Sequence, residues 1–233
     1  MREAIVLAGG KAERLGEAAV GRPKALVEVA GRPLLAYQVG LLVRAGVERV
    51  IVSCAADKGH LFEYELNGLG ADIVPIEESE PLGRGGGLRF AAQALEEPGD
   101  VFALNGDELV DVDLAALAER HRLAGAAATI TVVPLRSPFG IVDLDENDAV
   151  IGFQEAPRLP HWVSCGVYVL GREALRRLPE RGDHETSTFP ELAAEGRLHA
   201  FRHEGLWITV NTPKDLRIAQ EHVAAHPEWL GAA

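Results

Sequence analysis

The chain has 233 residues, of which 47% are hydrophobic and 25% are charged, and this suits one large α/β domain whose core needs no disulfide or structural metal. Its formal net charge of −12 at pH 7 argues against nucleic-acid binding, because proteins of that class present a basic face. No apolar run approaches the roughly 18 residues of a membrane span, and the N-terminus lacks the pattern of a signal peptide. We therefore expect a cytoplasmic protein that binds neither nucleic acid nor a membrane. Cys54 and Cys165 lie inside apolar runs, and we expect both to be buried free thiols.

Apolar β-rich runs alternate with helical patterns through the first half of the chain, which is typical of βαβ units that build a parallel sheet. The predicted strands are Ala4–Leu7, Arg49–Cys54, Asp72–Ile76, Val101–Leu104 and Thr129–Val133. The predicted helices are Pro33–Ala45, Leu61–Leu66, Gly87–Leu95 and Leu114–Leu123. Short, continuous apolar strands suit a sheet that is covered on both faces. The predicted fold class is therefore α/β, with a Rossmann-like three-layer αβα architecture and a mostly parallel mixed sheet.

The pattern changes after about residue 135. Residues 138–157 are typical of a β-hairpin with its turn at 146–148. Further short strands are expected in 162–170, 199–205 and 206–210. A last helix is predicted to begin at Thr212, which can cap it ahead of Pro213 at the first helical position, while Asp215 lies in the positive first turn.

A strand that runs directly into two glycines is the strongest local signal of a functional site. This segment comprises Leu7, Ala8, Gly9, Gly10 and Lys11, and it is followed by Arg14 and Lys24. A glycine pair lets backbone N–H groups approach phosphate oxygens with no Cβ in the way. Arg14 can supply a fork for the β- and γ-phosphates, and Lys24 a point charge for the α-phosphate. The spacing matches neither the dinucleotide fingerprint nor the Walker pattern, and by itself the segment could also be a tight turn before a solvated basic loop.

Further short motifs follow in a fixed order over nearly the whole chain. They are Val29–Leu35, Pro81–Gly86, Leu104–Asp107, Phe139–Gly140, Gln154–Pro157, Ser164–Tyr168, Phe189–Pro190, Gly205–Trp207 and Thr212–Pro213. Together with the ten-residue step from Arg14 to Lys24, this series resembles the signature of sugar-1-phosphate nucleotidyltransferases, in the superfamily of MobA-like NTP transferases. The resemblance implies a fold of the nucleotide-diphospho-sugar transferase type. It also implies one nucleotidyltransferase domain over 1–233, with a nucleotide-binding half of about 1–110 and an acceptor-binding half of about 111–233.

The resemblance implies a Mg²⁺ site at Asp107, which ends a predicted strand at the edge of the sheet where open α/β folds place their ligands. The family usually has a second acidic ligand in a Trp-x-Asp segment, and Thr209 stands at that position here. Asn211 is the alternative ligand, because an amide oxygen also suits a hard cation. Asn211 could equally be a turn residue before the last helix.

The resemblance also assigns nucleotide and acceptor contacts. Leu7, Ala8, Gly9, Gly10, Lys11, Gly83, Arg84 and Asn105 are the expected nucleotide-binding residues, and Gly140, Glu155 and Ser164 the expected acceptor-binding residues. Two positions depart from the family: Ala156 replaces a lysine that touches the acceptor phosphate, and Ser164 replaces a common asparagine. We expect Arg136 or Arg158 to supply the charge that Ala156 cannot.

The function that the resemblance implies is an enzyme, a nucleotidyltransferase that moves NMP from an NTP to a phosphorylated small-molecule acceptor. The expected acceptor is a sugar 1-phosphate, and the products are an NDP-sugar and pyrophosphate. Arg14, Lys24 and Asp107 would carry the catalysis, with Mg²⁺ as cofactor. Ala156 and Ser164 leave open a non-sugar acceptor such as molybdopterin or an alcohol phosphate. A non-catalytic sensor of nucleotide sugars is a further alternative, against which the presence of all three catalytic residues argues.

Overall fold

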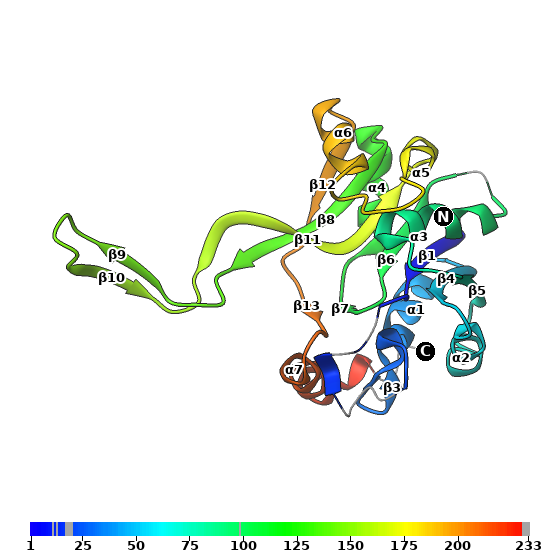
Figure 1. Cartoon of the computed structure of the whole chain (residues 1–233), viewed down its shortest axis with the longest axis horizontal. Helices are drawn as coiled ribbons and strands as arrows, with labels where there is room; N and C mark the ends of the chain where they lie inside the picture. The colour runs from blue at the N-terminus through cyan, green and yellow to red at the C-terminus, as the bar shows by residue number, and fades with distance from the viewer. Residues whose placement is uncertain (11, 13, 17–20, 98, 230–233) are drawn as a thin grey trace.

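The computed structural model describes residues 1–10, 12, 14–16, 21–97 and 99–229. A seven-stranded sheet organises them in the order β12-β8-β11-β6-β1-β4-β5 (Figure 1). Its strands are β1 (Glu3–Leu7), β4 (Arg49–Ala55), β5 (Asp72–Glu78), β6 (Val101–Asn105), β8 (Ala128–Arg136), β11 (Arg158–Leu170) and β12 (Leu198–Arg202). Only β11 runs antiparallel to its neighbours β6 and β8, whereas the other pairings are parallel. The predicted mostly parallel mixed sheet is therefore confirmed.

Helices cover both faces of this sheet. One face packs against α1 (Leu34–Arg44), α2 (Gly59–Glu65) and α4 (Leu114–Ala124), and the other against α3 (Gly83–Ala91), α5 (Arg172–Arg177) and α6 (Thr188–Ala194). Along β1, the buried side chains alternate between the two cores: Val6 belongs to the first and Ile5 to the second. The three-layer αβα architecture is confirmed.

The C-terminal segment returns to the N-terminal part of the molecule. Helix α7 (Pro213–Ala225) packs beside the short pair β2 (Glu28–Val29) and β3 (Arg32–Pro33) in a third apolar cluster. Thr212 caps α7 in a capping box with Asp215, and Pro213 stands in the first turn, as predicted. Strand β13 (Trp207–Thr209) pairs with β7 (Glu108–Val110), and this small sheet lies between the large sheet and α7 (Figure 1). The remaining short turns of 3-10 helix are η2 (Lys24–Leu26), η3 (Ala92–Ala94) and η4 (Pro227–Trp229).

The predicted hairpin is confirmed as β9 (Ile141–Leu144) and β10 (Val150–Gln154). It continues the ends of β8 and β11 and projects far from the rest of the molecule (Figure 1). At its base, the Ser137 N–H donates to the Pro157 carbonyl over 2.9 Å. Among the described residues, no helix is long and apolar enough to cross a membrane. Cys54 and Cys165 are buried free thiols, as predicted.

Helix α3 begins at Gly83, four residues before the predicted start at Gly87. The predicted helix covered only Gly87–Leu95, and the glycines before it are poor helix formers. The glycines are required for packing: a Cβ at Gly85 would lie 2.7 Å from the His184 backbone nitrogen, and one at Gly86 would lie 2.7 Å from the Glu180 carbonyl oxygen. The early start of α3 therefore reflects its close approach to the segment 179–184.

His184, on that segment, is fully buried with its ring edge-on to Tyr168 and Phe189 at centroid distances of 5.4 and 4.7 Å. Neither ring nitrogen has a hydrogen-bond partner within the described residues, and the nearest carboxylate oxygen, of Asp183, is 3.8 Å away. Burial lowers the pKa of His184 to about 4 from its usual 6.5. The folded protein therefore holds this histidine neutral.

This burial predicts a stability that falls in acid. Between pH 6.5 and pH 4 the unfolded chain binds a proton that the folded chain excludes, so the free energy of unfolding decreases as the pH is lowered through that window, by about 3 kcal/mol. Urea unfolding between pH 4 and 7 should show that the free energy of unfolding decreases less in His184→Phe than in wild type as the pH is lowered. The control His60→Phe, at an exposed site on α2, should keep the wild-type pH dependence. If the free energy of unfolding depended on pH equally in wild type and in His184→Phe, the burial of His184 would not be the cause.

Candidate functional site

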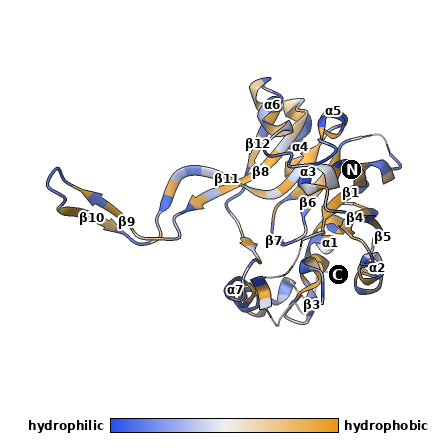
Figure 2. Ribbon diagram, viewed as in Figure 1, coloured by the Kyte–Doolittle hydropathy of each residue, from blue (hydrophilic) through white to orange (hydrophobic). Residues whose placement is uncertain are grey.

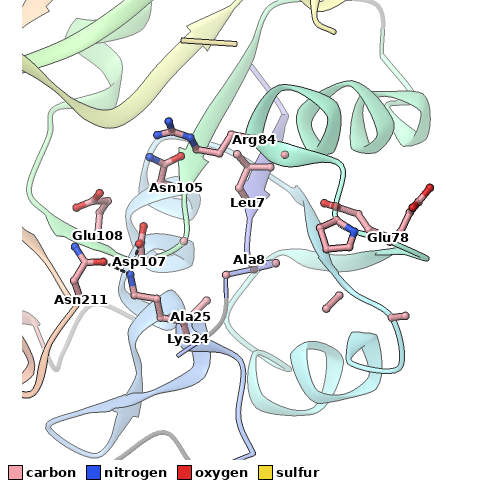
Figure 3. A pocket seen from close by; sticks show the side chains of 18 of the residues that line it. Leu7, Ala8, Lys24, Ala25, Glu78, Arg84, Asn105, Asp107, Glu108 and Asn211 are labelled. Carbon is pink, nitrogen blue, oxygen red and sulfur yellow. Dashed lines mark hydrogen bonds and ion pairs between the residues drawn. The ribbon is translucent and has the colours of Figure 1, made fainter. Parts of the chain in front are cut away.

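A cavity of about 660 Å³ opens at the carboxyl ends of four parallel strands. Leu7, Ala55, Glu78 and Asn105 are the last residues of β1, β4, β5 and β6, and all four line it. In open α/β sheets, this edge is where ligands bind. Ten predicted site residues line the cavity, many of them labelled in Figure 3: Leu7, Ala8, Gly9, Gly10, Lys24, Gly83, Arg84, Asn105, Asp107 and Asn211.

The other predicted site residues lie elsewhere. Arg14 is exposed and is not part of the cavity lining, and Lys11 falls outside the described residues. Ser164, on β11, is partly buried outside the cavity, and Gly140 and Glu155 belong to the projecting hairpin. Arg136 and Arg158, expected as replacements for the missing lysine, lie at the base of that hairpin.

The glycine pair after β1 leaves open space beside the backbone. Among the described residues, a Cβ at Gly9 or at Gly10 would meet nothing closer than 3.9 Å, so packing against this part of the protein does not require glycine at either position. Within the described residues, the N–H groups of Gly9 and Gly10 donate no hydrogen bond. Two unpaired donors at the edge of a cavity are suited to bind anionic oxygens. The geometry thus supports the prediction of a phosphate-binding turn.

Lys24 extends from η2 to the floor of the cavity, where its ammonium group donates hydrogen bonds to the Asp107 carboxylate and to the Asn211 amide oxygen (Figure 3). The Lys24 side chain is only 10% exposed and that of Asp107 31%. A cation thus already sits between the two oxygens that were predicted to hold Mg²⁺. This donor set, one carboxylate and one amide oxygen converging on a positive charge, fits a hard divalent cation. Within the described residues no three His, Cys, Asp or Glu side chains form a metal cluster, so such a cation would need further oxygens from phosphates or water.

The amide of Asn211 has a defined orientation. Its Nδ2 donates to Thr209 Oγ1 over 2.7 Å, which turns Oδ1 toward Lys24. Thr209, at the position of the family's acidic ligand, therefore orients Asn211. This contact favours Asn211 over Thr209 as the second ligand.

The turn that carries Asp107 is held from two sides. Gln38 on α1 is buried, and its Nε2 donates to the backbone carbonyls of Asn105 and Glu108 at 2.8 and 2.7 Å. From the C-terminal side, the Val210 N–H donates to the Asp107 carbonyl over 2.9 Å. A Cβ at Gly106 would lie 2.8 Å from the Leu7 carbonyl oxygen, so only glycine lets this turn pack against the end of β1. These contacts fix Asp107 beside the glycine pair.

Glu108 is a cavity residue that the sequence did not reveal. It lies directly opposite Thr209 in the β7–β13 pair, is 6% exposed, and accepts a hydrogen bond of 2.8 Å from Trp207 Nε1. Burial, together with the negative charge of Asp107, raises the pKa of Glu108 to about 9. The carboxyl of Glu108 is therefore neutral at pH 7. The only sequence signal was its position next to Asp107.

Arg84 connects the cavity to strand β11. Its guanidinium pairs with Asp183, through an Nε to Oδ2 contact of 2.8 Å, and with Glu185 at 2.7 Å. Glu185 accepts from the Tyr168 hydroxyl at 3.2 Å, and that hydroxyl lies 3.4 Å from Ser164 Oγ. Arg84 is therefore ion-paired, and its contacts continue through Glu185 and Tyr168 to Ser164.

The family model described as nucleotidyl transferase matches residues 3–226. The mannose-1-phosphate guanylyltransferase of Mycobacterium tuberculosis is 34% identical over 224 residues, covering 91% of this chain and 62% of the relative. The mannose-1-phosphate guanylyltransferase catalytic subunit beta of Drosophila pseudoobscura pseudoobscura is 31% identical over 221 residues, covering 91% of this chain and 60% of the relative. The chain therefore spans about 60% of the length of these relatives.

Two solved structures are similar over nearly the whole chain. HddC from Yersinia pseudotuberculosis superposes with a TM-score of 0.75 at 24% identity, covering 95% of this chain and 99% of the other. The UTP-bound UGPase from Acinetobacter baumannii gives a TM-score of 0.77 at 22% identity, covering 98% and 95%. These likenesses confirm the predicted fold type.

The convergence of Asp107 and Asn211 predicts how divalent cations bind in the presence of nucleotide. Asp107→Asn removes the charged ligand, and the dissociation constant of Mn²⁺, measured by electron paramagnetic resonance with a non-hydrolysable NTP analogue, should rise about tenfold or more. Asn211→Asp adds a carboxylate at a position already oriented by Thr209 and should lower that constant. The control Asp113→Asn alters only the cap of α4. Unchanged Mn²⁺ binding in Asp107→Asn would place the metal elsewhere.

Proposed function

We propose that this chain, which belongs to the nucleotidyl transferase family, transfers NMP from an NTP to a sugar 1-phosphate and releases pyrophosphate. The observation that carries the proposal is the arrangement at the cavity floor, where Lys24, Asp107 and Asn211 converge beside the open glycine pair. In this proposal residues of about 1–110 hold the nucleotide, and those of about 111–233 hold the acceptor.

The chemistry needs no general base, because the acceptor phosphate is already an anion at neutral pH. Catalysis then consists of in-line positioning and of neutralising charge on the α-phosphate and the departing pyrophosphate. The N–H groups of Gly9 and Gly10 would bind phosphate oxygens at the cavity edge, and the Lys24 ammonium would face the α-phosphate. Arg14, exposed beside this turn, would have to swing inward to meet the outer phosphates.

Nucleotidyltransferases generally use divalent metal ions, and we propose Mg²⁺ for this chain. Asp107 and Asn211 would hold the ion, which supplies positive charge to the phosphates when bound. Lys24 now occupies this position between the two oxygens, so the bound cation would displace the ammonium toward the substrate. An acidic protein can accommodate a polyphosphate through this local group of positive charges.

GTP and a hexose 1-phosphate are the substrates best supported by the comparisons, because the relatives named above are mannose-1-phosphate guanylyltransferases. Crossing four NTPs and Mg²⁺ with mannose 1-phosphate, glucose 1-phosphate, glycerol 3-phosphate and molybdopterin, and measuring pyrophosphate, tests the proposal. We expect release with a sugar 1-phosphate, and fastest release with GTP. Release only with a non-sugar acceptor would redirect the proposal to that acceptor, and nucleotide binding without release under any pairing would favour a sensor.

Lys24→Ala should lower the rate of pyrophosphate release about 10²- to 10³-fold, since it removes a charge aimed at the reacting phosphate. Circular dichroism should show an intact fold. Lys214→Ala, which removes an exposed lysine from the first turn of α7, is the matched control and should keep the wild-type rate. Wild-type turnover in Lys24→Ala would remove Lys24 from the catalytic assignment.

A further inference from the structure

The projecting hairpin presents apolar side chains to solvent along its whole length. We call residues 137–157 the arm. Within the described residues, seven of the ten large hydrophobic side chains that are exposed belong to it: Phe139, Ile141, Val142, Leu144, Val150, Ile151 and Phe153, between 37% and 74% exposed. Figure 2 shows hydrophobic segments on the β9–β10 hairpin, which projects far from the body of the molecule. Scattered exposed apolar residues are ordinary, but a gathered set of this size marks an interaction site.

The register of the arm places four of these side chains on one face. Val142 lies opposite Phe153 and Leu144 lies opposite Val150. Val142 and Leu144 are two positions apart in β9 and so share a face, and a bulge between Val150 and Gly152 brings Val150 and Phe153 to the same side. The four side chains therefore form a continuous apolar strip across both strands.

The arm lacks the support that an isolated ribbon needs. β9 and β10 form a two-stranded sheet, and within the described residues no third strand pairs with either edge. Two-stranded ribbons are marginally stable in water unless a further strand or surface packs on them, and unpaired edges invite association. An arm that extends in this way is best explained by a surface that packs against its apolar strip.

The charges of the arm separate along its length. Residues 137–157 contain five acidic side chains and no Lys, Arg or His, with Asp143, Asp145, Glu146 and Asp148 gathered toward the tip. The base is basic: Arg136 and Arg158 face each other across β8 and β11. Arg202 joins them, because Arg158 and Arg202 lie over the Trp162 ring at 5.3 and 5.0 Å. Arg158 also pairs with Glu204 at 3.3 Å, whereas Arg136 and Arg202 have no carboxylate partner within the described residues. The arm thus has an acidic tip and, at its base, two arginines without an ion pair in the described part of the chain.

We propose that the arm packs against the arm of a second copy of this chain. The two arms lie antiparallel about a two-fold axis, with the apolar strips in contact and each acidic tip beside the arginines of the other base. A two-fold interface repeats every contact, so this arrangement satisfies both tips and both bases at once, whereas a parallel arrangement would bring eight carboxylates together. The arm contains Gly140 and Glu155, which the resemblance assigns to acceptor binding, but the pairing is measured by association alone, so its test does not depend on the reaction.

Sedimentation equilibrium of the full chain from about 1 to 100 μM tests the pairing, since a specific dimer has a dissociation constant in or below this range. We expect a dimer in wild type, and at least a hundredfold weaker association in Leu144→Glu/Phe153→Glu. Both residues are exposed, so circular dichroism should show an intact fold. The matched control Tyr64→Glu/Leu123→Glu alters exposed apolar residues, 82% and 66% accessible, outside the arm and should leave the dimer unchanged. A monomer over the whole range, or a dimer that the arm variant leaves intact, would overturn the proposal.

A charge exchange tests the antiparallel arrangement. Arg136 is exposed and has no ion pair within the described residues, and Glu146 is exposed at the tip. Arg136→Glu and Glu146→Arg should each weaken association about tenfold, since each loses two symmetric attractions and gains repulsion. The double variant restores complementarity and should associate nearly as tightly as wild type. A double variant weaker than either single one would contradict the placement of tip against base.

Discussion

The ammonium group of Lys24, held between the Asp107 carboxylate and the Asn211 amide oxygen, is the contact on which the rest of the site depends. A partly buried cation requires oxygens around it, and these two come from segments 83 and 187 residues away in sequence. The large sheet brings β1 and β6 side by side, and the β7–β13 pair returns the C-terminal segment to them. If the segments of Lys24, Asp107 and Asn211 did not meet, the cavity beside Gly9 and Gly10 would lack the charged groups of Lys24 and Asp107.

The sequence predicted the elements of the large sheet and the capped start of α7 because these follow from local patterns: apolar runs, helical spacing and capping chemistry. It also predicted that Lys24, Asp107 and Asn211 belong together, through the order of motifs along the chain. What it could not predict depends on the tertiary contacts themselves. Glu108 becomes a buried, neutral cavity residue only because β13 pairs with β7 and places Trp207 against its carboxyl.

The glycines at the start of α3 show how one pattern can have two causes. The resemblance assigned Gly83 and Arg84, at the start of this glycine run, to nucleotide binding. In the structure, Gly85 and Gly86 allow close packing against 179–184, while Arg84 pairs with Asp183 and Glu185. Gly9 and Gly10 differ, because a Cβ at either position would meet no atom of the described residues closer than 3.9 Å. The fold therefore requires glycine at positions 85 and 86, whereas Gly9 and Gly10 leave room for a ligand.

The C-terminal segment contacts the site through the Val210 N–H bond to the Asp107 carbonyl and through Asn211 beside Lys24. These contacts affect the order in which the site forms during synthesis on the ribosome. Lys24, Gln38 and Asp107 emerge while Asn211 and Val210 are still to be synthesised, so the nascent polypeptide can form most of its sheet and still lack a complete site. Contacts of such high sequence separation form late, since closing the intervening chain costs entropy before the contact forms. The partly made chain therefore lacks the Asn211 oxygen beside Lys24, and the floor of the cavity is complete only once the chain has been built beyond residue 211.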